Sequence, residues 1–205
     1  MRRAAVATYR LTRHELVLTT SLLRWVTRRP PHGVRPAAGD LPVPYASGQT
    51  TVFLLFFFVS VVETVALAFL IPWPLVHRLL LVLGVWGCYF VVALHASCVV
   101  RPHVVGADGS LRLRYGALVG VAVPADRIAS VRRDRRFPGG GLVRVGDDGE
   151  LDLAVGSQTN VTVELTEPVA FTRPLGRRAS ARVLRFYADD PDATVAALRT
   201  AGTRT

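Results

Sequence analysis

The amino-acid sequence predicts a membrane protein of the α+β class, with a two-helix transmembrane hairpin followed by a small antiparallel β-sandwich or partly open barrel and a C-terminal helix. Three observations predict this class. Two long apolar runs lie close together, short β-branched segments separated by turn residues follow them, and a helical pattern closes the chain. The 205 residues divide into a basic amphipathic helix (1–29), a Pro/Gly-rich linker (30–50), the hairpin (51–100) and a cytoplasmic β domain (101–205).

Residues 52–71 and 79–100 form the two apolar runs. Each contains about 20 residues, which at about 1.5 Å rise per residue span a hydrocarbon core of about 30 Å. The first run contains a single charged residue and the second none, whereas a soluble helix of this length carries a polar face. Pro72 and Pro74 end the first helix, and Trp73 is a residue type that settles at the headgroup boundary. Both chain ends are therefore expected on the same side of the bilayer.

The distribution of arginine predicts which side that is. Eight arginines precede the first run and sixteen follow the second, against Arg78 alone between them. Positive residues stay in the cytoplasm, so both termini are predicted to be cytoplasmic, although only Arg35, Arg101, Arg112 and Arg114 lie within about 20 residues of a span. The net charge of +10 comes from arginine without any lysine, which is typical of a GC-rich bacterial genome. The predicted location is the bacterial plasma membrane, where this charge favours anionic lipid over nucleic acid.

Small and polar residues recur one helical turn apart within the hairpin. Such residues let helices approach closely in lipid, so the seam of each helix is expected to face the other. Glu63 is the member that is most costly to place in lipid. An intramembrane carboxyl group is by default a functional-site hypothesis, for example a proton or cation step. The alternative is a structural role, with a hydrogen bond across the seam. Counting rise from the turn places it nearer Tyr89 than His95. The predicted seam contains Ser60, Glu63, Thr64 and Ala68 on the first helix and Gly84, Cys88, Tyr89, His95 and Cys98 on the second.

The N-terminal segment predicts a basic amphipathic helix. Thr12 and Glu15 have the spacing of a capping box, and two prolines at residues 30–31 stop the helix. Such a helix beside a span lies along the anionic inner leaflet with its tryptophan at the interface. The alternative is that its apolar face docks on the cytoplasmic domain or on a second subunit. The residues expected at the membrane surface are Arg10, Arg13, Arg24, Trp25 and Arg28.

From residue 103 the sequence pattern changes to short β-branched segments separated by turn residues, which is typical of strands. Turns containing Gly109 and Gly149 indicate hairpins, and Asp189, Asp190 and Asp192 offer N-caps for a helix over residues 194–201. The predicted strands are 103–105, 111–115, 119–123, 129–133, 142–145, 151–155, 161–165 and 181–187.

Several of these segments carry a resemblance to a known family. Residues 101–116 and 121–124, with Ile128 and Val131, resemble the start of bacterial pleckstrin-homology-like (PH-like) domains that follow a two-helix membrane hairpin, and residues 188–198 are similar to their ending. The whole chain resembles uncharacterised actinobacterial membrane proteins of this layout, and departs from them in the glycine insertion at 139–141 and the arginines before it. The resemblance implies a PH-like fold and a membrane location, and it supplies no catalytic residues.

One surface constellation is a candidate binding site. Arg132, Arg133, Arg135, Arg136 and Phe137 are predicted to bind lipid phosphates or a partner, with forked guanidinium contacts and the ring dipping into the interface. The alternative is a solvated charged loop.

No catalytic, cofactor or metal signature accompanies this constellation. The glycines that follow it lack the lysine and serine of a P-loop, and the acids at 147, 148, 150 and 152 lack the calcium-loop spacing. His95 and Cys98 supply only two ligands, and no metal site is expected.

These observations predict a non-enzymatic two-pass membrane protein whose cytoplasmic PH-like domain is an interaction module. Its expected partners are the lipid bilayer, a homo-oligomer or another membrane protein, with no cofactor and no nucleic acid. The alternative is a small accessory subunit of a transporter or secretion system, with Glu63 and His95 contributing from the seam.

Overall fold

The computed structural model describes residues 2–146, 149–173 and 177–202, with backbone alone described at 2–11, 13 and 202. The chain divides into two compact units, one formed by Met1–Arg29 and Gln49–Ser97, the other by Pro30–Gly48 and Cys98–Thr205. We refer to them as the helical unit and the β unit. Asp147 and Asp148, two of the acids noted in the sequence, lie outside the described residues.

The helical unit begins with α1 (Arg2–Val26). The predicted capping box is therefore wrong, because Thr12 and Glu15 lie inside the helix. Ala and Arg have high helix propensity and are frequent in residues 2–11, so the helix starts earlier than the capping pattern indicates. At its other end Arg28 adopts a left-handed conformation (φ +52°), and the N–H of Arg29 donates to the carbonyl of Arg24 at 3.0 Å. This is a left-handed C-cap, and it ends the helix before the prolines.

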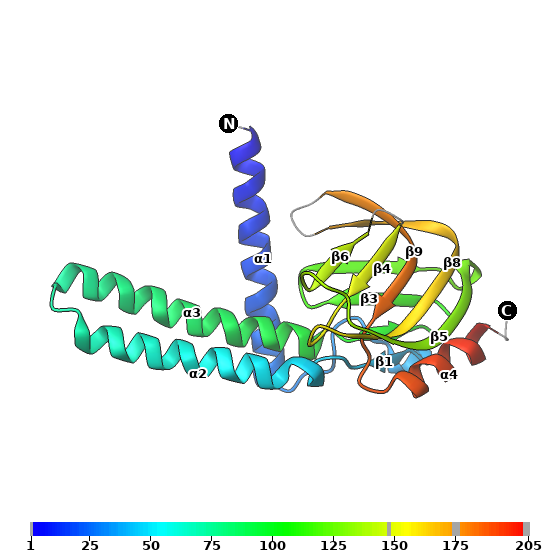
Figure 1. Cartoon of the computed structure of the whole chain (residues 1–205), viewed down its shortest axis with the longest axis horizontal. Coiled ribbons are helices and arrows are strands. Elements are labelled where there is room, and N and C mark those ends of the chain that lie inside the picture. The colour runs from blue at the N-terminus through cyan, green and yellow to red at the C-terminus, as the bar shows by residue number, and fades with distance from the viewer. Residues whose placement is uncertain (1, 147–148, 174–176, 203–205) are drawn as a thin grey trace. The chain divides into compact units, whose positions relative to one another are not determined.

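Two apolar helices, α2 (Ser47–Leu70) and α3 (Pro74–Val100), run antiparallel and are joined by a short turn (Figure 1). Their 24 and 27 residues give lengths of about 36 and 40 Å. In the described part of the chain these two helices are long and apolar enough to cross a membrane. The most apolar 18-residue window of α2 has none of its residues buried, and that of α3 has 11%. They are thus unlike the core helices of a soluble protein, which are mostly buried.

The first sheet of the β unit has the order β1-β2-β3-β4, and all its neighbours are antiparallel. Its strands are β1 (Leu41–Val43), β2 (His103–Val105), β3 (Leu111–Tyr115) and β4 (Val119–Val123). The last three were predicted at these bounds. β1 comes from the segment that the sequence treats as a linker, and it pairs with β2 through Pro42↔Val104. That segment is therefore part of the β unit.

The second sheet has the order β5-β8-β9-β7-β6, and every pair is antiparallel except β7 and β9, which are parallel. Its strands are β5 (Ile128–Arg136), β6 (Val143–Val145), β7 (Glu150–Leu153), β8 (Thr159–Thr172) and β9 (Arg178–Phe186). Helix α4 (Pro191–Gly202) follows β9, and the short helices η1 (Pro36–Ala38) and η2 (Ala125–Arg127) complete the described elements. Asp190 caps α4, since its Oδ1 accepts the N–H of Ala193 at 2.9 Å.

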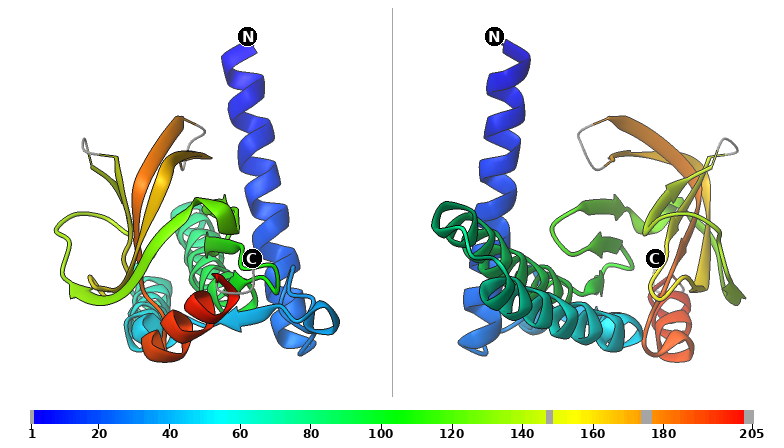
Figure 2. Two further views of the ribbon diagram at one scale, coloured as in Figure 1. Left: turned by 90° about the vertical axis from the view of Figure 1, so that its right-hand side faces the viewer. Right: turned by 60° about the vertical axis from the view of Figure 1, so that its left-hand side comes forward.

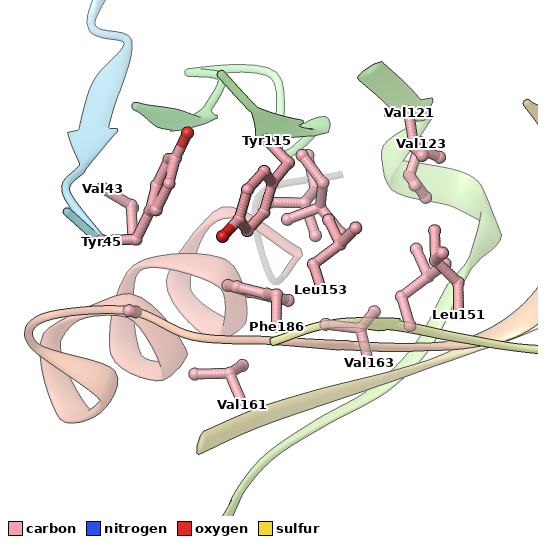
Figure 3. Packing of buried hydrophobic residues seen from close by; sticks show 14 of the residues in the cluster. Val43, Tyr45, Tyr115, Val121, Val123, Leu151, Leu153, Val161, Val163 and Phe186 are labelled. Atoms are coloured by element: carbon pink, nitrogen blue, oxygen red, sulfur yellow. The ribbon is translucent and has the colours of Figure 1, made fainter. Parts of the chain in front are cut away.

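The core lies between the two sheets, and residues such as Tyr115, Val123, Leu153 and Phe186 point into it (Figure 3). In β3 and β4 every second residue is buried, which is the period of a strand with one face on a core. The largest fully buried side chains include Tyr45, Tyr115, Phe186, Leu111, Leu113, Leu151, Leu153 and Leu184. The two sheets stay separate ladders among the described residues (Figure 2), so the unit is an open sandwich and not a closed barrel.

Candidate functional site

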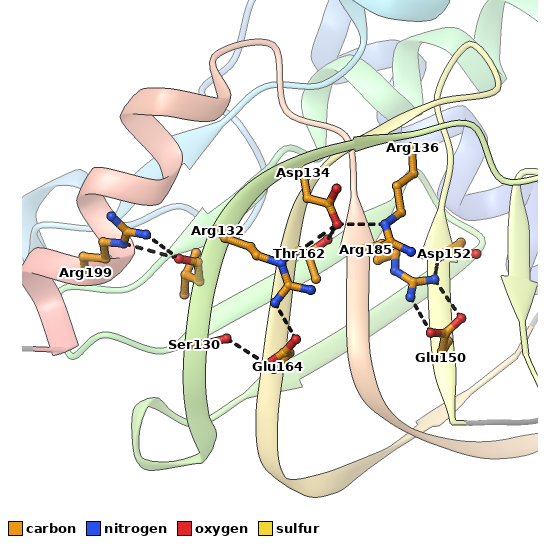
Figure 4. A network of polar contacts seen from close by, with 11 residues as sticks. Ser130, Arg132, Asp134, Arg136, Glu150, Asp152, Thr162, Glu164, Arg185 and Arg199 are labelled. Carbon is orange, nitrogen blue, oxygen red and sulfur yellow. Dashed lines mark hydrogen bonds and ion pairs between the residues drawn. The ribbon is translucent and has the colours of Figure 1, made fainter.

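The charged side chains of the second sheet form a network across its strands (Figure 4). On β5, Arg132 forms a close ion pair with Glu164 of β8. Asp134 accepts a hydrogen bond from Nε of Arg136 at 2.7 Å and one from the hydroxyl of Thr162 at 3.3 Å. The network therefore begins at the strand that the sequence singled out, and it continues into strands that the sequence did not link to it.

Arg185 of β9 is the central cation of the network. Its two terminal nitrogens bind the two carboxylate oxygens of Glu150 on β7, and the Nη1–Oε2 distance is 2.7 Å. Nη1 also lies 3.5 Å from Asp152 Oδ1. Its side chain is only 13% exposed. This is the forked, bidentate geometry that makes arginine–carboxylate pairs strong.

The register of the sheet explains why these side chains meet. Neighbouring strands place Arg132 opposite Thr162, Thr162 opposite Arg185, Arg185 opposite Asp152, and Asp152 opposite Arg144. Residues directly opposite on adjacent strands have Cβ atoms about 5 Å apart. One row of polar side chains therefore crosses all five strands on a single face of the sheet.

The network sets the ionisation of its carboxyl groups. Hydrogen bonds from Arg136, Arg185 and Arg132 lower the pKa values of Asp134, Glu150 and Glu164, respectively, below the usual range. Burial instead raises the pKa of Asp152, and the charge of Arg185 offsets only part of that effect.

The charges of the network balance one another. Figure 4 shows its cations Arg132, Arg136 and Arg185 with its carboxylates Asp134, Glu150, Asp152 and Glu164, and the fourth arginine, Arg144, lies opposite Asp152 in the register. Arg132, Arg136 and Arg185 are already paired with carboxylates, so each would have to leave its carboxylate to bind a phosphate.

The structure separates the five residues predicted to bind lipid or a partner. Arg132 and Arg136 belong to the network. Arg133 faces the other way and forms an ion pair with Asp192 of α4 at 2.7 Å. Arg135 and Phe137 are exposed, the latter by 72%.

A pocket of about 250 Å³ lies where the network meets the loop after β5. Arg144 donates to the carbonyl of Gly139 at 3.3 Å, which ties the glycine insertion to β6. The pocket presents three guanidinium groups and one carboxylate, a set suited to one small anionic or amide group. Its lining residues are Arg136, Phe137, Pro138, Gly139, Arg144, Asp152 and Arg185.

The described residues contain no cluster of three or more His, Cys, Asp or Glu side chains placed to hold a metal ion. The strongest candidate for a buried catalytic group is His103, and its surroundings account for both ring nitrogens. The N–H of Arg114 donates to Nδ1 at 3.0 Å, and Nε2 lies 3.2 Å from the carbonyl of Tyr187. Nδ1 is therefore the acceptor and Nε2–H the donor, which is the neutral ring. Burial lowers its pKa to about 3.

Tyr45 packs beside His103, with ring centroids 4.4 Å apart. Its hydroxyl accepts the N–H of Gly116 at 2.7 Å, and burial raises its pKa well above the ordinary value. The N–H of Asp189 donates to the carbonyl of Pro44 at 2.8 Å. These contacts hold the segment that leads into α2 within the β unit, so this polar cluster is structural.

The hairpin seam is confirmed at one point. A Cβ placed on Gly84 would lie 2.3 Å from Oγ1 of Thr64, so α2 and α3 approach closely there. The Thr64 hydroxyl donates to the carbonyl of Ser60 at 2.7 Å, which satisfies it within its own helix. Small residues thus serve the packing role expected of them.

The expected hydrogen bond between Glu63 and Tyr89 is not present. The Tyr89 hydroxyl instead lies 2.6 Å from Oγ1 of Thr19 in α1, and Glu63 is exposed. At about 100° per residue, Glu63 lies about 100° around α2 from Thr64, so it cannot face α3 as Thr64 does.

Helix α1 docks on α3, an arrangement that neither sequence alternative anticipated. The ring of His95 lies 6.2 Å from that of Trp25 in α1 and 5.3 Å from that of Phe53 in α2. Arg28 is exposed and Arg24 is half-buried. The side chains of Arg10 and Arg13 lie outside the described residues.

Comparisons with protein-family models, with curated proteins and with solved structures found no match to this chain.

Proposed function

We propose that the chain is a non-enzymatic two-pass protein of the bacterial plasma membrane, with both termini in the cytoplasm and a PH-like β domain that acts as an interaction module. The observation that carries this proposal is the outward-facing apolar surface of α2 and α3. Exposing a large apolar side chain to water instead of burying it costs about 1.5–3 kcal/mol, and α2 alone exposes Leu54, Leu55, Phe56, Phe58, Phe69 and Leu70. Lipid removes that cost.

The interaction role rests on the face of the second sheet. Charged groups of both signs cover it, and the exposed Phe137 lies beside its pocket. Balanced charges with one exposed aromatic anchor are typical of a protein interface, since aromatic residues dominate binding there and paired charges confer orientation. We infer that the preferred partner of this face is a membrane protein or a second copy, ahead of anionic lipid.

A photo-crosslinking amino acid placed at Phe137 or Arg144, which both line the pocket of this face, in the full chain in native membranes, tests this role. We expect each to form a discrete protein adduct, whereas the same group at the exposed Glu167 of β8 does not. Adducts with lipid alone would support the headgroup function and overturn the protein-partner one. Equal protein adducts at all three positions would show that partner proteins do not bind this face in preference to the rest of the surface.

The accessory-subunit alternative is favoured by one observation, the exposed carboxyl group of Glu63 within α2. The ring of His95 contacts Trp25 and Phe53, so this alternative now rests on Glu63. Loss of a transport phenotype in Glu63→Gln, with normal protein level and assembly, would favour it.

A further inference from the structure

Glu63 lies near the middle of a candidate span. It is about 16 Å along the helix from Val52 and about 12 Å from Ile71, at 1.5 Å per residue. It is exposed and, among the described contacts, has neither a hydrogen bond nor an ion pair. A carboxyl group in lipid without a partner is costly, and such residues face another protein segment or water.

The spans of this chain do not supply that partner. Their apolar cores contain no arginine or lysine, and Arg78 lies at the turn, where its Nε donates to the carbonyl of Pro74 at 3.2 Å. Tyr89 is bonded to Thr19 of α1. Within the described part of the chain, no side chain is therefore seen to meet Glu63.

Glu63 belongs to a stripe of α2 that does not face α3. Stripe residues are spaced alternately four and three apart, which is the a/d spacing of a helix pair with heptad packing. A polar residue at one such position fixes the register of the pair, and the small Ala66 beside it permits close approach. The stripe consists of Val52, Phe56, Val59, Glu63, Ala66 and Leu70.

We propose that this stripe is the dimer interface of the protein, occupied by the same stripe of a second copy, with Glu63 against Glu63 across a twofold axis. The chemistry of the carboxyl group selects this occupant. A carboxyl group that holds its proton carries one donor and one acceptor, so two of them related by a twofold axis exchange two hydrogen bonds. A second α2 satisfies Glu63 without any cation, and it covers the apolar residues above and below.

This proposal rests on the proposed function, because it requires α2 to lie in the bilayer. The test uses the full chain with Cys88→Ala in native membranes, where the buried Cys98 remains as background. One cysteine is added at a time, at Val59 or Ala66 on the stripe, or at Val61 or Val65 on the opposite side of α2. We expect oxidation to give a disulfide-linked dimer at Val59 and Ala66 and little above background at Val61 and Val65.

Substitution of Glu63 separates its hydrogen bonds from its size. With the cysteine at Val59, Glu63→Leu is expected to lower the association constant of the dimer about fivefold, which corresponds to about 1 kcal/mol of interhelical hydrogen bonding. Glu63→Gln keeps a donor and an acceptor and is expected to stay within about twofold. Val65→Leu is the matched control and is expected to have no effect.

The outcomes separate this inference from the function on which it rests. Cysteines that resist water-soluble maleimide yet form no dimer would overturn the dimer and leave the membrane location intact. A cross-link to a different protein alone would also overturn it. Rapid labelling of Val59→Cys by maleimide in intact membranes would place α2 in water and overturn both.

Discussion

Lowering the pH from 7 to 5 is expected to destabilise the β unit, because its core holds His103 in the neutral form. The ring is 1% exposed, stacks on Tyr45 and meets Phe186 edge-on at 5.1 Å. Its Nδ1 already accepts the N–H of Arg114. A proton on Nδ1 would face that donor, so protonation requires the site to open.

The size of this pH effect follows from the pKa of His103 in the unfolded and folded chains. The pKa of His103 falls from 6.5 to about 3 on folding, so between these values the unfolded chain binds a proton that the folded chain does not. Stability therefore falls as the pH is lowered through 6.5 and continues to fall toward 3. Between pH 7 and pH 5 this linkage amounts to about 2 kcal/mol at 1.36 kcal/mol per pKa unit.

Amide hydrogen exchange of β2 and β3, measured by mass spectrometry on the full chain in detergent, gives the opening free energy at each pH. His103→Gln lacks the titrating ring and serves as the control, because other groups titrate in both proteins. Asp134, Glu150 and Glu164 have lowered pKa values and lose their contribution only in stronger acid, and the raised pKa of Asp152 has the opposite sign. We expect the wild type to lose about 2 kcal/mol more than the variant between pH 7 and 5. Equal losses would refute the buried neutral histidine.

Three substitutions test other contacts. Gly84→Leu is expected to separate the hairpin helices and lower expression in membranes, whereas Gly87→Leu on the same helix meets open space and is expected to be neutral; equal expression would contradict the close approach. Tyr45→Phe removes the acceptor of a buried backbone N–H and is expected to destabilise the β unit by about 1–3 kcal/mol in urea unfolding; an unchanged midpoint would argue against that bond. Arg185→Gln leaves two carboxylates facing each other without their cation. It is expected to lower the free energy of unfolding by about 2 kcal/mol at pH 7 and by less at pH 4. The exposed Arg178→Gln is its control, and a loss independent of pH would contradict the ionic origin.

The hairpin and the eight predicted strands, which overlap β2 to β9, were predictable because their signals are local. An unbroken apolar run reports a candidate span whatever surrounds it, and alternation in residues 111–115 reports a strand with one buried face. Strand β1 was missed because three residues around Pro42 carry little local signal, and their partner β2 lies about 60 residues further along the chain.

The charged network was not predictable for the same reason. Arg185 and Glu150 are 35 residues apart, and they meet only because β7 pairs with β9 in parallel. The sequence shows four arginines close together at the end of β5, but the partners of three of them lie on β5 itself, β8 and α4. The side of α2 on which Glu63 lies was not predictable either, since a helix that is apolar on all sides has no polar face by which to orient it.

The central claim is that α2 and α3 cross the bilayer as a pair and leave both termini in the cytoplasm. Paired reporters test it most directly, one active only in the cytoplasm and one active only outside it, each fused after Thr205 or inserted beside Trp73 in the turn. We expect the cytoplasmic reporter to be active at Thr205 and the external one at Trp73. External activity at Thr205, or the same compartment at both positions, would contradict the account.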